Sequence, residues 1–347
     1  MSIGILNKYG EHIDLGGATP ISMGEGDTPL IYSNYLSEET GGSIYLKVEG
    51  CNPSGSFKDR GMVVAVCKAL QKNKKILVCA STGNTSASAS AYAAKFGLVS
   101  AIIVPKGNIA KGKLAQAMAF GAKIIAIDGS FDDALNIVRK LENESSVEIV
   151  NSINPYRIEG QKTAAFEIID SLGSIDYLCI PVGNAGNISA YWKGFKEYVN
   201  FKNFKLPKML GFQAEGAAPI VKGKIIDNPD TIATAIRIGN PASWKSAESA
   251  ISESNGSIHS VTDNEIIESY VNLARKDGIY CEPASAAGVA GLLKLSKEID
   301  LNGKKITCVV TGNGLKDPVT SEKFASTNIH EVKSELKEVL KAINKKD

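Results

Sequence analysis

The stretch from residue 74 to residue 104 reads KKILVCASTGNTSASASAYAAKFGLVSAIIV and carries the pattern of a strand, a helix and a second strand. Its first part, residues 74–80, is a short apolar run that predicts a buried strand. The alanine-rich residues 84–96 predict a helix, and residues 99–104 predict the next strand. Two buried strands joined by a crossover helix run parallel to each other. The stretch therefore predicts an α/β fold built on a parallel sheet.

The same alternation continues along the rest of the chain. Further strands are expected at 123–127, 148–150, 177–182, 209–213 and 305–310. Further helices are expected at 111–120, 131–141, 160–171 and 188–198, and near residues 247, 266 and 287. This repeated order of elements is typical of α/β domains.

The last predicted helix, within residues 331–347, has an apolar stripe along one face. The residues of the stripe are Val332, Leu336, Val339, Leu340 and Ile343. A stripe of this kind needs a surface to cover it. We expect it to pack on the protein's own body, and contact with a partner is the alternative.

Charge and hydropathy exclude several classes of protein. The chain has 347 residues, with 39 Lys and Arg against 37 Asp and Glu, so its net charge is +2. That balance argues against a protein that binds nucleic acid or a membrane surface. The apolar runs are shorter than the roughly 20 residues that a membrane-spanning helix needs. Residues 1–8 lack the pattern of an export signal, so we expect a cytoplasmic protein.

Cysteine and histidine offer little for catalysis or metal binding. The six cysteines are widely separated and form no C-x-x-C pair, which favours free thiols in a reducing compartment. The three histidines lie far from other candidate ligands. We therefore expect no metal site, and the chemistry has to be built without imidazole.

Three predicted strands end in glycine-asparagine turns, at residues 82–84, 183–187 and 311–314. The carboxyl ends of parallel strands form one rim of the sheet, where ligands bind. The turn at 183–187 opens a helix, whose free N–H groups and dipole suit a phosphate. A tight turn with a purely structural role is the alternative. The chain lacks G-x-x-x-x-G-K-[ST] and G-x-G-x-x-G, so neither a nucleotide nor a dinucleotide is indicated.

Lys58 is the candidate reactive residue. It lies in the sequence NPSGSFKDR (52–60), where turn residues lead through Phe57 into a predicted helix. A lysine is usually a solvated surface group, and the Lys-Asp-Arg sequence could simply form ion pairs at the start of a helix. In a dry crevice, however, the amine loses its charge more readily and can form an imine with a carbonyl. A lysine and a phosphate-binding turn together suggest pyridoxal phosphate as cofactor.

Seven segments match one known family in order, from about residue 24 to residue 318. They are residues 24–30, 52–61, 81–86, 151–157, 181–188, 282–288 and 311–318. These segments resemble those of the threonine synthases, which share their fold with the tryptophan synthase β chain and threonine dehydratase. The resemblance implies two domains, each an open, mostly parallel twisted sheet flanked by helices, with the active site in the crevice between them.

The resemblance also implies how the chain is divided. The large domain that binds pyridoxal 5'-phosphate would comprise residues 1–51 and 152–347. Residues 52–151 would form a smaller, mobile domain, whose closure excludes water before the chemistry begins. Members of the family are commonly homodimers, and we expect the same assembly here.

The resemblance assigns roles around the cofactor. The residues that it implies are Phe57, Lys58, Asn84, Gly183, Asn184, Ala185, Gly186, Asn187 and Thr311. Lys58 would bind the cofactor covalently and move protons, and Asn84 would donate to the ring hydroxyl. Thr311 would face the pyridine nitrogen, and the turn at 183–187 would hold the phosphate.

The resemblance further implies the substrate, O-phospho-L-homoserine, which reacts with water to give L-threonine and phosphate in the last step of threonine biosynthesis. The loop with Ser81, Thr82, Asn84 and Thr85 would bind the α-carboxylate of the substrate. Its phosphate would be bound by Asn151, Ser152 and Arg157, with Thr85 and Asn184.

Three alternatives remain open. A threonine or serine dehydratase on the same scaffold would also use Lys58, but it would not need Asn151, Ser152 and Arg157. A non-catalytic protein that binds pyridoxal phosphate or another anion would have lost the reactive lysine. A dehydrogenase would carry a glycine fingerprint that is missing here.

Overall fold

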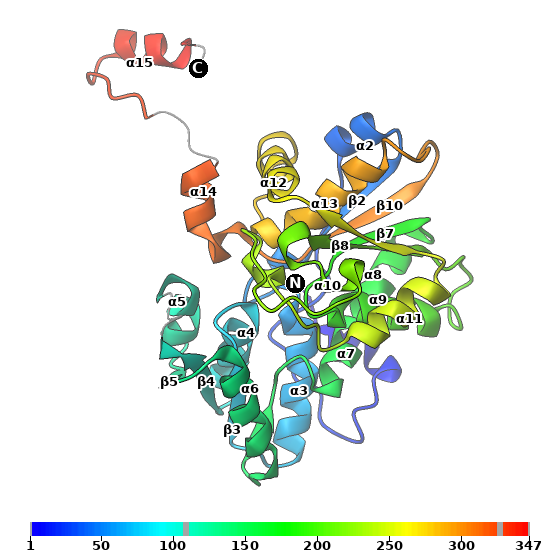
Figure 1. Ribbon diagram of the computed structural model, residues 1–347, viewed down its shortest axis with the longest axis vertical. Helices are drawn as coiled ribbons and strands as arrows, with labels where there is room; N and C mark the ends of the chain where they lie inside the picture. The colour runs from blue at the N-terminus through cyan, green and yellow to red at the C-terminus, as the bar shows by residue number, and fades with distance from the viewer. Residues whose placement is uncertain (1, 107–110, 325–328, 346–347) are drawn as a thin grey trace.

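The structure is a computed structural model that describes residues 2–106, 111–324 and 329–345 (Figure 1). Its larger sheet has the strand order β1-β2-β10-β7-β8-β9. The bounds are Leu30–Tyr32 (β1), Ser43–Val48 (β2), Lys305–Val310 (β10), Tyr177–Pro181 (β7), Lys208–Ala214 (β8) and Ser257–Val261 (β9). Strand β1 pairs antiparallel to β2, and all the other neighbours run parallel.

The smaller sheet has four parallel strands in the order β5-β4-β3-β6. The bounds are Lys123–Ile127 (β5), Val99–Pro105 (β4), Ile76–Ala80 (β3) and Val147–Ile149 (β6). The predicted α/β fold with two mostly parallel sheets is confirmed. β1, β2 and β9 lie outside the strands that the pattern predicted. β1 has three residues, β9 is mostly half-buried, and Lys47 interrupts the apolar run of β2.

Helices flank both sheets (Figure 1). Their bounds are Ile5–Tyr9 (α1), Asn34–Thr40 (α2), Lys58–Gln71 (α3), Asn84–Lys95 (α4), Lys111–Ala119 (α5), Phe131–Lys140 (α6), Pro155–Gln161 (α7), Thr163–Leu172 (α8), Gly186–Tyr198 (α9), Pro219–Lys222 (α10), Trp244–Glu253 (α11), Asp263–Asp277 (α12), Pro283–Leu295 (α13), Pro318–Phe324 (α14) and Leu336–Ile343 (α15). The one helix predicted at 160–171 is two helices. The first, α7, starts earlier because Asn154 caps it by accepting from the Tyr156 N–H.

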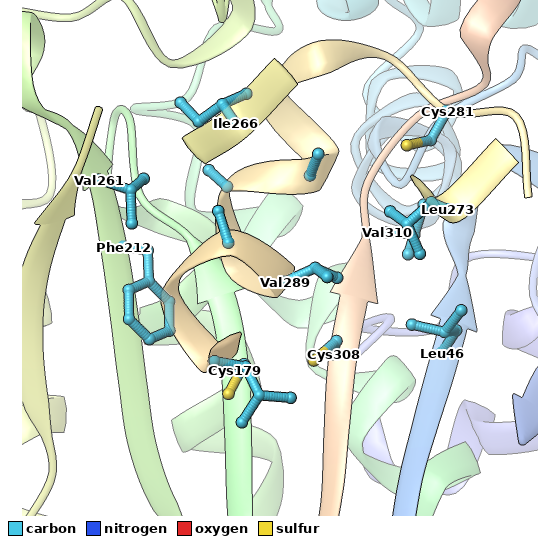
Figure 2. Close-up of a cluster of buried hydrophobic side chains, with 14 of the residues drawn as sticks. Leu46, Cys179, Phe212, Val261, Ile266, Leu273, Cys281, Val289, Cys308 and Val310 are labelled. Atoms are coloured by element: carbon cyan, nitrogen blue, oxygen red, sulfur yellow. The ribbon is translucent and has the colours of Figure 1, made fainter. Parts of the chain in front are cut away.

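The core of the larger sheet is formed around α13, which packs against β7, β8 and β10 (Figure 2). This helix is rich in alanine and glycine and is buried along nearly its whole length. A Cβ at Gly291 would lie 1.9 Å from Cδ1 of Phe212, so only glycine allows the helix to approach the sheet this closely. The packing fixes the start of α13, and with it Glu282, at the end of β10.

The smaller sheet shares its core with α3 and α4. Helix α3 is buried along almost its whole length. Ile5 and Leu6 from the N-terminal helix pack in the same cluster. The predicted domain boundaries, 1–51 with 152–347 and 52–151, stay a prediction. The small sheet uses residues 76–149, whereas the strands of the larger sheet come from both flanks.

The prediction for the C-terminal stripe is wrong. Figure 1 shows α15 apart from both sheets, and Leu336 and Ile343 are 77% and 70% exposed. An amphipathic pattern indicates that one face of a helix suits an apolar partner, but it does not specify which surface supplies it. Nothing in the described part of the chain covers this face.

The described residues offer neither a membrane-spanning helix nor a cluster of metal ligands. None of their helices has the length and apolar character required to cross a bilayer. Within the same residues, no group of three or more His, Cys, Asp or Glu is arranged to hold a metal ion. All six cysteines are free, and only Cys51 is exposed.

Candidate active site

The three glycine-asparagine turns follow β3, β7 and β10, as predicted. The first and third turns are joined through Glu282, which accepts from the Asn84 side chain and donates its own N–H to the Gly312 carbonyl. The second turn touches α7, since a Cβ at Gly186 would lie 3.6 Å from Cδ1 of Ile158. The structure therefore brings the three turns, α7 and the start of α3 together in one region.

Two glycines allow α3 and α7 to cross with their backbones in contact. A Cβ at Gly160 would lie 1.8 Å from the Arg60 carbonyl oxygen, and one at Gly61 would lie 2.6 Å from the Arg157 carbonyl oxygen. No larger residue fits at either position without moving a helix. This crossing brings Arg157 close enough to Lys58 for its charge to lower the pKa of the amine.

Lys58 is the first residue of α3, and the loop before it is tied to the end of β10. The Phe57 N–H donates to the Thr311 carbonyl, and Ser56 pairs with Gly312. The Lys58 Nζ lies 4.1 Å from the centroid of the Phe57 ring. Burial and then the Arg157 charge lower the pKa of Lys58 to about 7, although Glu282 opposes the shift. Near neutral pH a substantial fraction of this amine is uncharged and nucleophilic.

Arg157 is 1% exposed, yet its guanidinium is only partly bonded. Nη1 donates to the Val150 carbonyl at 3.2 Å, whereas Nε and Nη2 find no partner among the described residues. Burial lowers the pKa of Arg157 to about 10, against the opposing effect of Cys79 and Asp59. A buried cation with unpaired N–H groups carries a desolvation cost that a bound anion offsets.

The turn at 183–187 has the features of a phosphate site. Ala185 adopts a left-handed backbone with φ of 65°, which points successive N–H groups into the turn at the start of the 13-residue helix α9. The Asn184 side chain accepts from the Ala242 N–H at 3.3 Å. Both polar atoms of the Asn187 side chain are buried and lack a partner within the described chain. The N–H groups of the turn and the Nδ2 of Asn187 are donors that fit the phosphate of pyridoxal phosphate.

Asn84 and Thr311 lie on either side of a carboxylate that sequence reasoning did not single out. The Asn84 Nδ2 donates to the two oxygens of Glu282 at 2.9 and 3.0 Å. The Thr311 hydroxyl lies 3.4 Å from Oε1 of Glu282 and 2.8 Å from the Ser285 hydroxyl. A sequence signal did exist, because Glu282 is a lone charged residue at the start of a helix of small, apolar residues.

The predicted substrate-binding residues occupy the same rim. The Ser81 hydroxyl accepts from the Gly83 N–H, Thr82 is half-buried, and Thr85 is buried in the first turn of α4. The Asn151 amide exchanges two hydrogen bonds of 3.1 Å with the backbone of Ala80. Asn151 therefore extends the pairing of β3 and β6, which leaves one amide hydrogen for a ligand.

Ser152 is half-buried in the turn that leads from Asn151 to α7. This turn connects the end of β6 to the helix that carries Arg157. The short connection places both residues near the end of β3, where the first glycine-asparagine turn begins. Of the predicted phosphate-binding residues, Asn151, Ser152 and Arg157 thus lie on one connected segment next to the end of β3.

Comparison with known proteins gives consistent matches. A family described as "Pyridoxal-phosphate dependent enzyme" matches residues 21–312. The threonine synthase of Halalkalibacterium halodurans is 56% identical over 329 residues, which cover 94% of this chain and 93% of that protein. The threonine synthase of Methanocaldococcus jannaschii is 51% identical over 326 residues, which cover 90% of this chain and 80% of that protein.

Solved structures share the fold at much lower identity. Threonine deaminase isoform 2 from Solanum lycopersicum, in its processed form, has a TM-score of 0.78 at 21% identity and covers 93% of this chain and 89% of its own. Maize serine racemase has a TM-score of 0.73 at 22% identity, with coverage of 86% and 91%. At this level of identity, the two structures support only the fold, that is, the arrangement of the sheets and helices.

Proposed function

The chain belongs to the threonine synthases, within the family of pyridoxal-phosphate-dependent enzymes, and on that premise we propose that it converts O-phospho-L-homoserine and water to L-threonine and phosphate. It is a lyase, and pyridoxal 5'-phosphate is its cofactor. The observation that carries the choice of substrate is the buried Arg157 guanidinium, whose Nε and Nη2 are unpartnered within the described residues. A substrate phosphate supplies the anion that this cation lacks.

The residues present fit the cofactor. Lys58 would bind it covalently, and the N–H groups of the turn at 183–187, with Asn187, would hold its phosphate. Asn84 and Thr311 would contact its ring, and Phe57 would pack beside the attachment point. When bound, pyridoxal phosphate supplies an electron sink that acidifies the protons on Cα, which carries the amino group, and on the neighbouring Cβ.

Lys58 is the group that moves protons. Because burial and the Arg157 charge lower its pKa to about 7, Nζ accepts a proton and returns it at similar cost near neutral pH. Its place at the first turn of a buried helix restricts the directions in which it can deliver the proton. One amine can therefore serve the several proton transfers that this reaction requires.

Arg157 binds the phosphate and stabilises it as it leaves. Because the guanidinium is buried and held by the Val150 carbonyl, its orientation is set before the substrate arrives. Ser152, Asn151, Thr85 and Asn184 would supply neutral donors around the same anion. Closure of residues 52–151 over the rest of the site would exclude water during this step.

Two further proposals concern the assembly of the enzyme and its compartment in the cell. The resemblance to the threonine synthases supports a homodimer in the cytoplasm. Sedimentation at several protein concentrations tests the assembly, and a monomer at micromolar concentration would contradict it. A homodimer is expected to keep the mass of two chains on dilution.

The experiment that tests the function measures phosphate released from O-phospho-L-homoserine, with the amino-acid product identified by chromatography. We expect equal amounts of phosphate and threonine. Release of ammonia and 2-oxobutyrate from threonine, without turnover of the phosphorylated substrate, would support the dehydratase instead. Reduction with borohydride is expected to label Lys58, and Lys58→Ala should remain folded but lose turnover and the label.

Arg157→Ala separates phosphate binding from cofactor binding. Turnover is expected to fall by about 10²–10³-fold, because a donor to the developing negative charge is removed. The affinity for pyridoxal phosphate, measured by its absorption band, is expected to change little. Arg157→Lys serves as the control that keeps a cation without the guanidinium fork. Equal losses of turnover and cofactor affinity would instead show that Arg157 has a structural role.

A further inference from the structure

Glu282 is a buried acid that the predicted roles leave without a function. It is 5% exposed and precedes α13, but its side chain does not cap that helix. Its carboxylate instead accepts from Asn84 and lies near the Thr311 hydroxyl. One acid therefore connects the two residues expected to contact the cofactor ring, from the first turn of α4 and from the end of β10.

The orientation of the Asn84 amide follows from this contact. A side-chain amide can turn over and exchange its oxygen with its nitrogen, and an ionised carboxylate accepts hydrogen bonds only from the nitrogen. Both oxygens of Glu282 lie within 3.0 Å of the same Nδ2. An amide hydrogen shared between them leaves the second hydrogen of Nδ2 available to a ligand.

The surroundings keep Glu282 in place. Its N–H donates to the Gly312 carbonyl at 3.0 Å, and a Cβ at Gly312 would lie 2.6 Å from Oε1. Burial raises the pKa of Glu282 above its usual value, although the Asn84 amide, Lys316 and Lys58 oppose the shift. The thiol of Cys281, the preceding residue, has its pKa raised by burial and by Glu282, so it stays neutral.

We propose that Glu282 is a positioning residue, which holds the Asn84 amide with its nitrogen turned toward the ring hydroxyl of the cofactor. The role rests on the cofactor-binding part of the proposed function. It is exerted through Asn84, and Glu282 need not touch the substrate. Loss of the carboxylate would leave the amide free to present its oxygen, which repels the anionic form of the ring hydroxyl.

A double-mutant cycle on cofactor affinity tests this role. Glu282→Ala is expected to weaken pyridoxal phosphate binding by about 10-fold to 100-fold, the range for one charge-assisted hydrogen bond. In the Asn84→Ala background, the same change is expected to alter affinity by less than about twofold, because the residue through which Glu282 acts is missing. Glu298→Ala, at an exposed glutamate beyond α13, is the matched control and should leave affinity unchanged.

The absorption spectrum gives a second readout, independent of turnover. In Glu282→Ala the visible band is expected to weaken in favour of a near-ultraviolet band, because the anionic ring hydroxyl loses its oriented donor. Asn84→Ala is expected to show the same change, and the double variant no further one. A residue that only stabilised the fold would lower the free energy of unfolding and leave the ratio of the bands unchanged.

The outcomes separate this inference from the function itself. Equal losses of affinity in the wild-type and Asn84→Ala backgrounds would overturn the role of Glu282 while leaving the enzyme assignment intact. A wild-type protein that shows no cofactor band would instead contradict the proposed function. Where Glu282→Ala does not fold, Glu282→Gln keeps the volume of the side chain. Its effect on the affinity for pyridoxal phosphate is expected to be smaller, and to disappear likewise in the Asn84→Ala background.

Discussion

Arg60 lies two residues after Lys58 and is completely buried. Every nitrogen of its guanidinium donates a hydrogen bond, and the carboxylate acceptors are Glu49 and Glu167 at 2.7–2.8 Å. Lys47 donates to the same Glu167 at 2.6 Å. Two cations thus balance two anions among buried side chains. This cluster holds the start of α3, and with it Lys58, against α8 and the end of β2.

Arg60→Ala would leave both carboxylates buried and short of a partner. We expect the free energy of unfolding in urea to fall by about 3–5 kcal/mol. Arg237→Ala is the control, because that arginine is exposed and its nearest acid, Asp230, lies 3.7 Å away. Its loss should stay below about 1 kcal/mol. Similar small losses in the two variants would show that the buried network contributes little.

Glu167 links the same cluster to acid stability. Burial raises the pKa of Glu167, but Arg60 and Lys47 outweigh that effect and hold it well below the usual 4.5. The unfolded chain therefore takes up a proton at a higher pH than the folded protein does. The stabilisation is present above about pH 4.5 and is lost as the pH falls below it.

The pH prediction is tested by urea unfolding at several pH values. The free energy of unfolding should decline below about pH 4.5 more steeply in the wild type than in Glu167→Gln. The readout is the slope of the free energy of unfolding against pH, because the substitution itself lowers that free energy at every pH. Parallel slopes in the two proteins would show that Glu167 titrates normally.

At the scale of the element, α13 and α15 differ in what surrounds them. α13 is apolar or small on every side and is enclosed by the larger sheet and α12. α15 has an apolar stripe on one face only, and that face is exposed. Burial of an amphipathic helix depends on a complementary surface, whereas a helix that is apolar all round must lie inside.

This difference predicts unequal costs for the same substitution. Leu292→Ala in α13 removes a completely buried side chain and should cost about 2–5 kcal/mol of unfolding free energy. Leu336→Ala in α15 removes a side chain that is 77% exposed and should change stability by less than about 0.5 kcal/mol. Denaturation in urea at one protein concentration compares them. A large cost at Leu336 would mean that the stripe is covered in solution.

At the scale of the molecule, the crossing of α3 and α7 sets the distance between the chemical groups. Lys58 belongs to the first helix and Arg157 to the second. Gly61 and Gly160 allow the backbones to touch. A second connection joins the segment after β10 to α5, where Lys316 Nζ donates to the Gln116 side chain at 2.5 Å. These contacts bring elements of both sheets to one site.

Gly160→Ala should therefore lower stability and activity together. The added Cβ would clash with the Arg60 carbonyl, and overpacking of this kind costs about 1–3 kcal/mol or more. Turnover should fall more than cofactor affinity, because Arg157 moves relative to Lys58. Gly10→Ala is the control, since nothing lies within 4 Å of a Cβ there. Normal turnover in Gly160→Ala would show that the helices can separate without consequence.

Local patterns in the chain were sufficient for the fold class and for the candidate lysine. The strand and helix periods depend on neighbouring residues, so most of the alternation between residues 74 and 310 could be read from the sequence, although β9 was missed. The glycine-asparagine turns could be read in the same way. Tertiary structure decided what depends on contacts between distant residues. The Asn84–Glu282 pair spans 198 positions and the Arg60–Glu167 pair spans 107, and no local pattern encodes such distances. The same reason explains why the uncovered face of α15 was not foreseen.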